Sequence, residues 1–395
     1  MSVLLLSTAL VASAEPTLKY QIEPTSSGPD TITVSVETKD LGSFNALPAR
    51  TLANDTQPAL LCVSTNGSLS AIEYQGPIQC DHVIWQLPLA EIDQDGFDIA
   101  KQIDSYEPTK GWRFVSEFNS LPRFSTHNGE TIPAQVCSPD NQCGWLPDAD
   151  QPPLFVVWGL TPVELNINGK TIEVTTDTEQ ILQTMHDWKP ALESQLNYLI
   201  SLFPDSTVNQ WDIAFFSRDK QAGSVSGAAG SDKILINAIL NNGQLEDEEM
   251  PMLLKIAAHE SMHLLDTTSP LWASESIAEY YANKSLDKTP YDFASPQAQW
   301  HDFKQKFPFA STGLLEADNL VSKEQQYQYY PLFYVKGPAF WQAIDQSLMD
   351  KGESLDSRLP TLTYNEDGNL SEVSITELTK VIGKKKWEEL AKLYL

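Results

Sequence analysis

Two histidines and a glutamate near residue 260 have the spacing of a metal site. His259, Glu260 and His263 form the pattern H-E-x-x-H. On a helix this spacing places the two imidazoles one turn apart on one face, with the glutamate beside them. A tetrahedral Zn²⁺ accepts both ring nitrogens, and a catalytic zinc site takes one further protein ligand and keeps a position for water. The pattern therefore predicts a zinc site that needs a third protein ligand.

The sequence around the histidines favours such a helix. The acidic residues 246–249 would lie where a helix N-terminus favours negative charge, and Pro251 is tolerated in a first turn. Ile256 falls on the same helical stripe as His259 and His263, so both histidines continue an apolar face. We therefore expect both imidazoles to point into the protein.

A second helix is expected from about Leu271, after a polar turn that ends in a proline. Its Glu275 and Glu279 are four residues apart and would lie on one face. We assign Glu275 as the third zinc ligand. Glu279 would accept a hydrogen bond from the free ring nitrogen of a ligand histidine, for which His259 is the candidate. The alternative for Glu279 is a carboxylate on a solvated helix face.

Both regions resemble the gluzincin metallopeptidases. Residues 272–281 resemble their W-x-x-E-G-x-A-x-Y signature, with Ser276 in place of the usual glycine. Residues 334–337 resemble the Y-x-K-G motif of the glycyl aminopeptidase and aminopeptidase N families. In those families the tyrosine donates a hydrogen bond to the developing oxyanion. The resemblance assigns this role to Tyr334, with Tyr329 and Tyr330 as alternatives.

The resemblance implies a zinc-dependent metallopeptidase that acts on peptides or proteins. Zinc held by His259, His263 and Glu275 would lower the pKa of a water to about 7 and polarise the scissile carbonyl. Glu260 would take the proton from this water as general base and pass it to the leaving amine. Tyr334 would stabilise the tetrahedral oxyanion.

Two other functions stay open at this point. One is a catalytically degenerate, zinc-containing binding protein of the cell envelope, and the other is a structural or adhesive exported protein without metal. The glycine-rich residues 223–230 lack the glutamate with which aminopeptidase N relatives hold a free amino group. Aminopeptidase activity is therefore not supported, and substrate preference and oligomeric state do not follow from the sequence.

The first residues and the cysteines favour export to the periplasm or the extracellular space. Residues 1–14 contain an apolar run and end in Ala-Ser-Ala, the A-x-A form of a signal-peptide cleavage site. The cysteines form two natural close pairs, Cys62 with Cys80 and Cys137 with Cys143, although four cysteines allow three connectivities. Disulfides are typical of an oxidising compartment.

The charge and hydropathy of the chain exclude several partner classes. With 26 basic and 53 acidic residues, the chain carries a net charge of −27. This charge argues against binding to nucleic acid and against adhesion to an anionic membrane. No stretch of eighteen apolar residues follows the N-terminus, so we expect no membrane insertion.

The expected fold class is α+β, with a β-rich N-terminal domain over residues 15–177 and a gluzincin-like catalytic domain over 178–395. Thr31–Thr38 alternates between apolar and polar residues, and Asn168-Gly169 is a strong hairpin signal. The second domain is expected to be thermolysin-like and mainly helical, with a small edge sheet. The expected helices cover residues 178–203, 296–307 and 338–350 and the end of the chain from 375. Residues 223–230 form either a flexible loop or an edge strand that pairs with an extended peptide.

Overall fold

The computed structural model describes residues 17–26, 28–50, 57–74, 76–246, 249–266, 270–291 and 293–395. The signal peptide expected over residues 1–14 lies outside them, as do two of the four acidic residues expected to precede the metal helix. The chain divides into two compact units. The first comprises the described residues up to Glu91 together with Ile103–Gly159, and the second comprises Ile92–Gln102 and Leu160–Leu395. The chain thus crosses between the units after residues 91, 102 and 159 rather than once at the expected boundary of 177.

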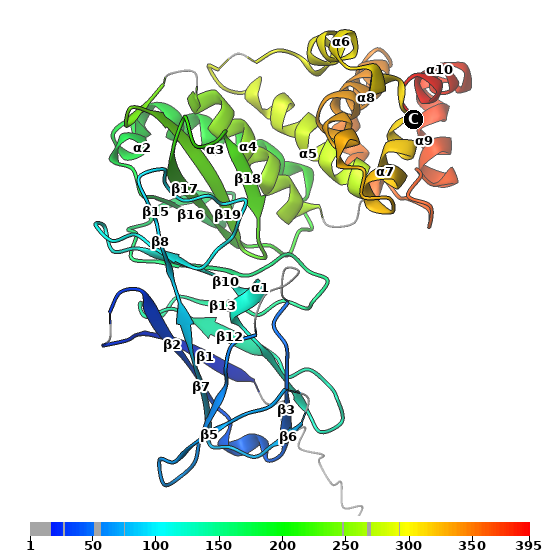
Figure 1. Ribbon diagram of the computed structural model, residues 1–395. Helices are drawn as coiled ribbons and strands as arrows, with labels where there is room; N and C mark the ends of the chain where they lie inside the picture. The colour runs from blue at the N-terminus through cyan, green and yellow to red at the C-terminus, as the bar shows by residue number, and fades with distance from the viewer. Residues whose placement is uncertain are drawn as a thin grey trace, which may run out of the picture. The chain divides into compact units, whose positions relative to one another are not determined.

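The first unit is rich in β-structure. Its largest sheet has the strand order β13-β12-β1-β2-β7-β4-β5 (Figure 1). The alternation predicted for Thr31–Thr38 is confirmed in β2, where Ile32, Val34 and Val36 are buried. The strands of this sheet are β1 (Leu18–Pro24), β2 (Thr31–Glu37), β4 (Leu61–Val63), β5 (Leu69–Ala71), β7 (His82–Pro88), β12 (Ala134–Cys137) and β13 (Cys143–Trp145).

The first unit also contains two smaller sheets and a short α-helix. One sheet has the order β14-β10-β9-β8 and the other β11-β3-β6. Both predicted cysteine pairs are confirmed as disulfides, Cys62–Cys80 and Cys137–Cys143. The remaining elements are β3 (Phe44–Leu47), β6 (Pro77–Ile78), β8 (Ala90–Glu91), β9 (Ser105–Tyr106), β10 (Arg113–Ser116), α1 (Glu117–Ser120), β11 (Arg123–Thr126) and β14 (Phe155–Trp158).

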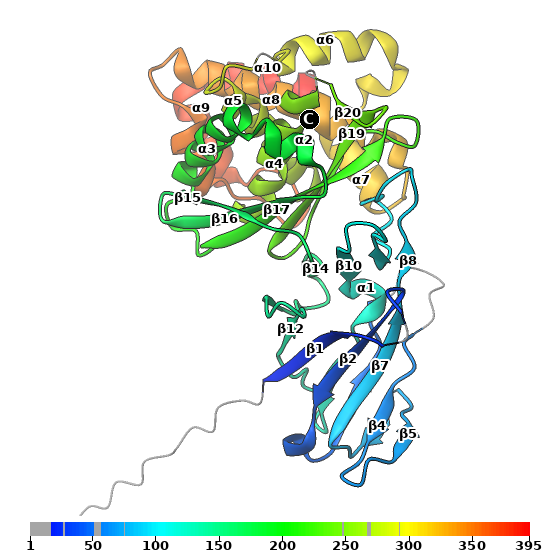
Figure 2. The same ribbon diagram turned by 90° about the vertical axis from the view of Figure 1, so that its left-hand side faces the viewer.

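Among its described residues the second unit contains one sheet of six strands, in the order β15-β16-β17-β19-β18, with β20 paired to β19. Figure 2 labels all of these strands except β18. The strands are β15 (Val163–Ile167), β16 (Lys170–Thr176), β17 (Gln210–Asp219), β18 (Ser226–Ala229), β19 (Lys233–Asn241) and β20 (Gln244–Leu245). The predicted hairpin turn is present, with positive φ at Asn168 and Gly169. Because β16 pairs in parallel with β17, this hairpin joins the second unit and not the first. The sheet is accordingly larger than the small edge sheet that we expected.

The rest of the second unit is largely helical, which confirms the expected order of a sheet-rich region followed by a helical one. The expected helix over 178–203 is interrupted at Thr184, and the helix expected from Pro338 begins at Pro331 and continues through Pro338. The helices are α2 (Glu179–Gln183), α3 (Met185–Leu202), α4 (Glu249–Leu265), α5 (Leu271–Leu286), α6 (Pro296–Lys306), α7 (Leu314–Ser322), α8 (Pro331–Met349), α9 (Glu372–Ile382) and α10 (Lys384–Tyr394).

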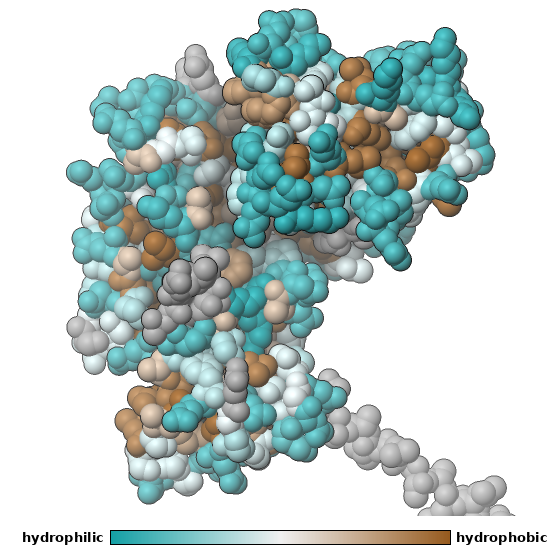
Figure 3. Space-filling model, turned by 45° about the vertical axis from the view of Figure 1, so that its right-hand side comes forward, coloured by the Kyte–Doolittle hydropathy of each residue, from teal (hydrophilic) through white to brown (hydrophobic). Residues whose placement is uncertain are grey.

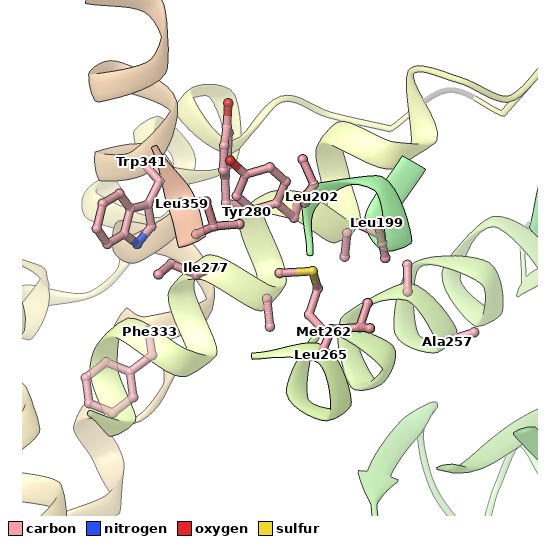
Figure 4. Close-up of a cluster of buried hydrophobic side chains, with 14 of the residues drawn as sticks. Leu199, Leu202, Ala257, Met262, Leu265, Ile277, Tyr280, Phe333, Trp341 and Leu359 are labelled. Atoms are coloured by element: carbon pink, nitrogen blue, oxygen red, sulfur yellow. The ribbon is translucent and has the colours of Figure 1, made fainter. Parts of the chain in front are cut away.

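Helix α4 is central to the core of this unit. It packs on β18 and β19 and also contacts α3 and α5, while α8 packs on α5. Apolar side chains from these helices meet in one buried cluster, and burial of this kind stabilises a fold by roughly 25 cal/mol per Å² of apolar surface. Figure 4 labels ten members of the cluster: Leu199, Leu202, Ala257, Met262, Leu265, Ile277, Tyr280, Phe333, Trp341 and Leu359.

Residues 92–102, which we call the excursion, lie between two strands of the first unit in sequence but pack in the second. Phe97 is buried, and its ring meets that of Phe216 at 5.0 Å between centroids. Asn237 donates to the Phe97 carbonyl at 2.7 Å. Arg218 forms an ion pair with Asp98 at 2.6 Å and donates to the carbonyl of Ala222, in the loop before β18. The excursion therefore braces the loop that leads to the edge strand.

The face of the molecule shown in Figure 3 is mostly hydrophilic, and its apolar residues form smaller separate patches. Within the residues described, no helix combines the length and the apolar character that a membrane span requires.

A carboxyl in the first unit makes stability depend on pH. Desolvation raises the pKa of Asp104 to about 7, against the opposing effect of hydrogen bonds from Ser120 and Ser116. The unfolded chain loses this proton near pH 4, so stability falls as pH rises from about 4 to about 7. Asp104→Asn is neutral at every pH and should escape this loss. Between about pH 5.5 and about pH 8, we expect its free energy of unfolding, measured with urea, to rise by about 2 kcal/mol relative to the wild type. A difference that does not change with pH would contradict this account.

Candidate functional site

Helices α4 and α5 bring three ligand atoms to one point. The Nε2 atoms of His259 and His263 lie 3.1 Å apart, and Oε2 of Glu275 lies 3.4 Å from the first and 3.6 Å from the second. In the part of the chain that the structure describes, these side chains form the one group of three that could hold a metal ion. Ligand atoms bound tetrahedrally to zinc at about 2.0–2.1 Å lie roughly 3.3–3.4 Å apart. The donor set and its spacing therefore fit zinc.

The other ring nitrogens of both histidines have partners. Nδ1 of His259 lies 3.1 Å from Oε2 of Glu279, and Nδ1 of His263 lies 3.1 Å from the Ser274 hydroxyl. When Nδ1 carries the proton and donates it to an acceptor, the lone pair of Nε2 is free for a metal ion. The structure thus places Glu279 where the sequence led us to expect it, and adds Ser274.

The electrostatics of the site favour a cation. Burial acts to lower the pKa of His259, but hydrogen bonds with Glu275 and Glu279 raise it to about 10. For Glu275, burial acts to raise the pKa, but the bonds with both histidines lower it well below its usual range. Carboxylates that stabilise positive charge on an imidazole in this way would also stabilise a divalent metal ion bound beside it.

Glu260 lies beside the edge strand of the sheet. A Cβ atom on Gly227 of β18 would lie 2.5 Å from Oε1 of Glu260 and 2.5 Å from Cγ2 of Ile256, so a larger residue here would displace the carboxyl. Burial raises the pKa of Glu260, while the charges of the two histidines and a backbone hydrogen bond from Ala229 lower it. The glycine-rich segment is therefore partly a strand, paired with β19 on one side and in contact with Glu260.

Two tyrosines of the α8 region reach the third ligand. Tyr330 donates to Oε1 of Glu275 at 3.0 Å, and Tyr334 donates to Oε2 at 2.7 Å. The Tyr334 ring also stacks on the His259 ring at 5.5 Å between centroids. Burial and the Glu275 charge raise the pKa of both tyrosines, so both hydroxyls are donors at neutral pH. Tyr329 instead packs against Phe309.

The contact between α5 and α8 explains the serine that replaces the usual signature glycine. A Cβ atom on Gly337 would lie 2.2 Å from Cβ of Ser276, so the space at this crossing comes from the glycine of α8. The Ser276 hydroxyl accepts a hydrogen bond from Nε1 of Trp341 at 2.8 Å, and Trp341 stacks on Trp272 at 5.9 Å. Helix α5 remains regular through this position, and Tyr334 is directed at Glu275.

Sequence reasoning missed three members of this site. Ser274 and Lys255 were not considered, and Tyr330 was only an alternative to Tyr334. Spacing offered a signal for Lys255, because it precedes His259 by four residues and shares its helix face. No comparable signal identified Ser274, whose role depends on the crossing of α4 and α5.

Comparisons with known proteins show the fold of the chain. No protein-family model matches the sequence, and no significant match was found among curated proteins. Among solved structures, the chain is similar to the crystal structure of an aminopeptidase N family protein from Idiomarina loihiensis. The TM-score is 0.59 at 13% identity, over 95% of this chain and 70% of that one. At this identity the similarity shows an aminopeptidase N-like fold and does not extend to the activity.

The geometry predicts one zinc ion per chain. We expect plasma mass spectrometry of the purified protein to find about one equivalent of zinc, and His263→Ala to lose it because one of the three ligands is removed. His301→Ala is the matched control, since that exposed histidine lies on α6, outside the group of three ligands. A folded wild-type chain that takes up no zinc would contradict the assignment of this site.

Proposed function

We propose that this protein is a zinc-dependent metallopeptidase that hydrolyses peptide bonds in peptides or proteins. The observation that carries the proposal is the convergence of Glu260 and Tyr334 on the candidate zinc ligands. A site that only held a metal for structural purposes would need neither side chain. Their presence also makes the catalytically degenerate binding protein the weaker alternative.

His259, His263 and Glu275 would hold the zinc, which supplies a Lewis acid that polarises the scissile carbonyl and acidifies water. Glu260 would accept a proton from the attacking water and deliver it to the leaving amine. Its pKa, raised by burial, suits a group that must both accept and donate a proton. Tyr334 would turn its hydroxyl from Glu275 to the developing oxyanion and donate a hydrogen bond there.

The edge strand β18 would hold the substrate. Its pairing with β19 leaves its other side for an extended peptide, which could add as a further strand. The close approach of Gly227 to Glu260 would bring the backbone of such a peptide next to the general base. The two disulfides support an exported protein, because such bonds persist in oxidising compartments.

Replacement of the general base tests the mechanism. We expect Glu260→Gln to keep its zinc and to lose turnover of a quenched fluorescent peptide library by about a hundredfold to ten-thousandfold. The amide has nearly the shape of the carboxyl but cannot accept the proton. Glu193→Gln, on the outside of α3, should leave turnover unchanged. Full activity in Glu260→Gln would remove Glu260 from the mechanism.

Replacement of Tyr334 and replacement of Tyr330 should have different effects on kcat and on zinc binding. Tyr334→Phe is expected to lower kcat by about a hundredfold, with KM and zinc affinity nearly unchanged, because its contact with the oxyanion exists only in the transition state. Tyr330 holds Oε1 of Glu275, the oxygen directed away from the histidines. Tyr330→Phe should therefore weaken zinc binding more than it lowers kcat at saturating zinc. Steady-state kinetics with zinc titration measure both, and the reverse pattern would exchange the two roles.

A further inference from the structure

A buried lysine lies one turn before the first histidine of α4. Lys255 is only 7% exposed, and its Nζ is paired with Oε1 of Glu279. The ammonium group also lies 4.7 Å from the centre of the Phe293 ring, within the range of a cation–π interaction. Burying a lysine is costly unless its charge is compensated. Lys255 meets this condition through Glu279.

Glu279 links this lysine to the metal site. Its Oε1 contacts Lys255, and its Oε2 lies 3.1 Å from Nδ1 of His259. Asn283 donates to the Glu279 backbone carbonyl at 2.7 Å and lies 3.4 Å from Oε1. Both carboxylate oxygens are thus engaged, and the three side chains form a continuous row from Lys255 through Glu279 to His259.

We propose that Lys255 is a positioning residue for the metal, acting through Glu279; this rests on the proposed function. Its ammonium group holds the Glu279 carboxylate in one orientation. In this orientation Glu279 accepts a hydrogen bond from Nδ1–H of His259, which leaves the Nε2 lone pair for the metal.

The charges of the site agree with this role. Oxygens of Glu275 and Glu279 lie within 3.4 Å of ring nitrogens of His259, and Lys255 places a positive charge beside the second of these carboxylates. Without Lys255, Oε1 of Glu279 would lose its charged partner.

The test measures zinc affinity by competition with a chelator, together with urea unfolding to verify that each variant is folded. We expect Lys255→Met to bind zinc about tenfold more weakly than the wild type, and Glu279→Gln about tenfold to a hundredfold more weakly. The double variant should bind no more weakly than Glu279→Gln alone, because Lys255 acts through that carboxylate. Lys255→Gln keeps a hydrogen-bond donor without the charge and gives the same comparison if methionine prevents folding.

Lys284 provides the matched control. It is also a largely buried lysine that pairs with carboxylates, but its partners Asp345 and Asp356 do not contact a candidate ligand. Lys284→Met should lower the free energy of unfolding and leave zinc affinity unchanged.

Three outcomes would overturn the proposal. Zinc affinity in Lys255→Met or Lys255→Gln within about twofold of the wild type would show that the lysine has no effect on the metal. Additive losses in the double variant would show that its effect does not pass through Glu279. Both results leave the peptidase proposal intact, whereas a wild-type chain that binds no zinc would remove the peptidase and the role of Lys255 together.

Discussion

The crossing of α4 and α5 is the contact on which the rest of the site depends. Helix α4 carries both histidines and Glu260. Helix α5 carries Glu275 and Glu279, whose carboxylate oxygens lie 3.1–3.6 Å from ring nitrogens of the histidines. Charged groups in a buried contact stabilise a structure only when each has a partner, so this interface tolerates little displacement. The sheet edge at Gly227 limits α4 on one side, and α8 limits α5 on the other through the contact of Gly337 with Ser276.

Periodicity and motif spacing could predict the local parts of this arrangement. The helical stripe through Ile256 and His259 was enough to predict that the imidazoles point inward. The spacing of Glu275 and Glu279 likewise predicted that both carboxylates lie on one face of their helix. The hairpin at Asn168-Gly169 was equally clear, because its turn chemistry is local. Its assignment to the first domain was wrong, since the parallel pairing of β16 with β17 joins residues that are 39 positions apart in sequence and leaves no local pattern.

Two further differences between the prediction and the structure also arise from contacts between segments that are far apart in sequence. Pro338 suggested the start of a helix, because proline suits a first turn, yet α8 begins at Pro331 and passes through it. The packing of α8 on α5 outweighs the loss of one backbone hydrogen bond. Ser274 is a member of the site only because of the crossing of α4 and α5, so its side chain could not be ranked above other serines, whereas Lys255 had at least its spacing from His259 as a signal. The fold, at 13% identity to a solved aminopeptidase N family protein, likewise persists without recognisable sequence similarity.

The excursion at residues 92–102 has a consequence for how this protein can be divided. A single proteolytic cut near Gly159 would leave Phe97 and Asp98 in the N-terminal fragment. Both residues pack on Phe216 and Arg218 of the C-terminal fragment, so the two fragments should stay associated. The two pieces would copurify like a nicked but assembled protein. A gene fragment that begins at Leu160 would encode both histidines and Glu275 but would lack this brace on the loop before β18. Residues 92–102 thus belong to the fold of the second unit, and that unit cannot be separated from the chain at a single boundary.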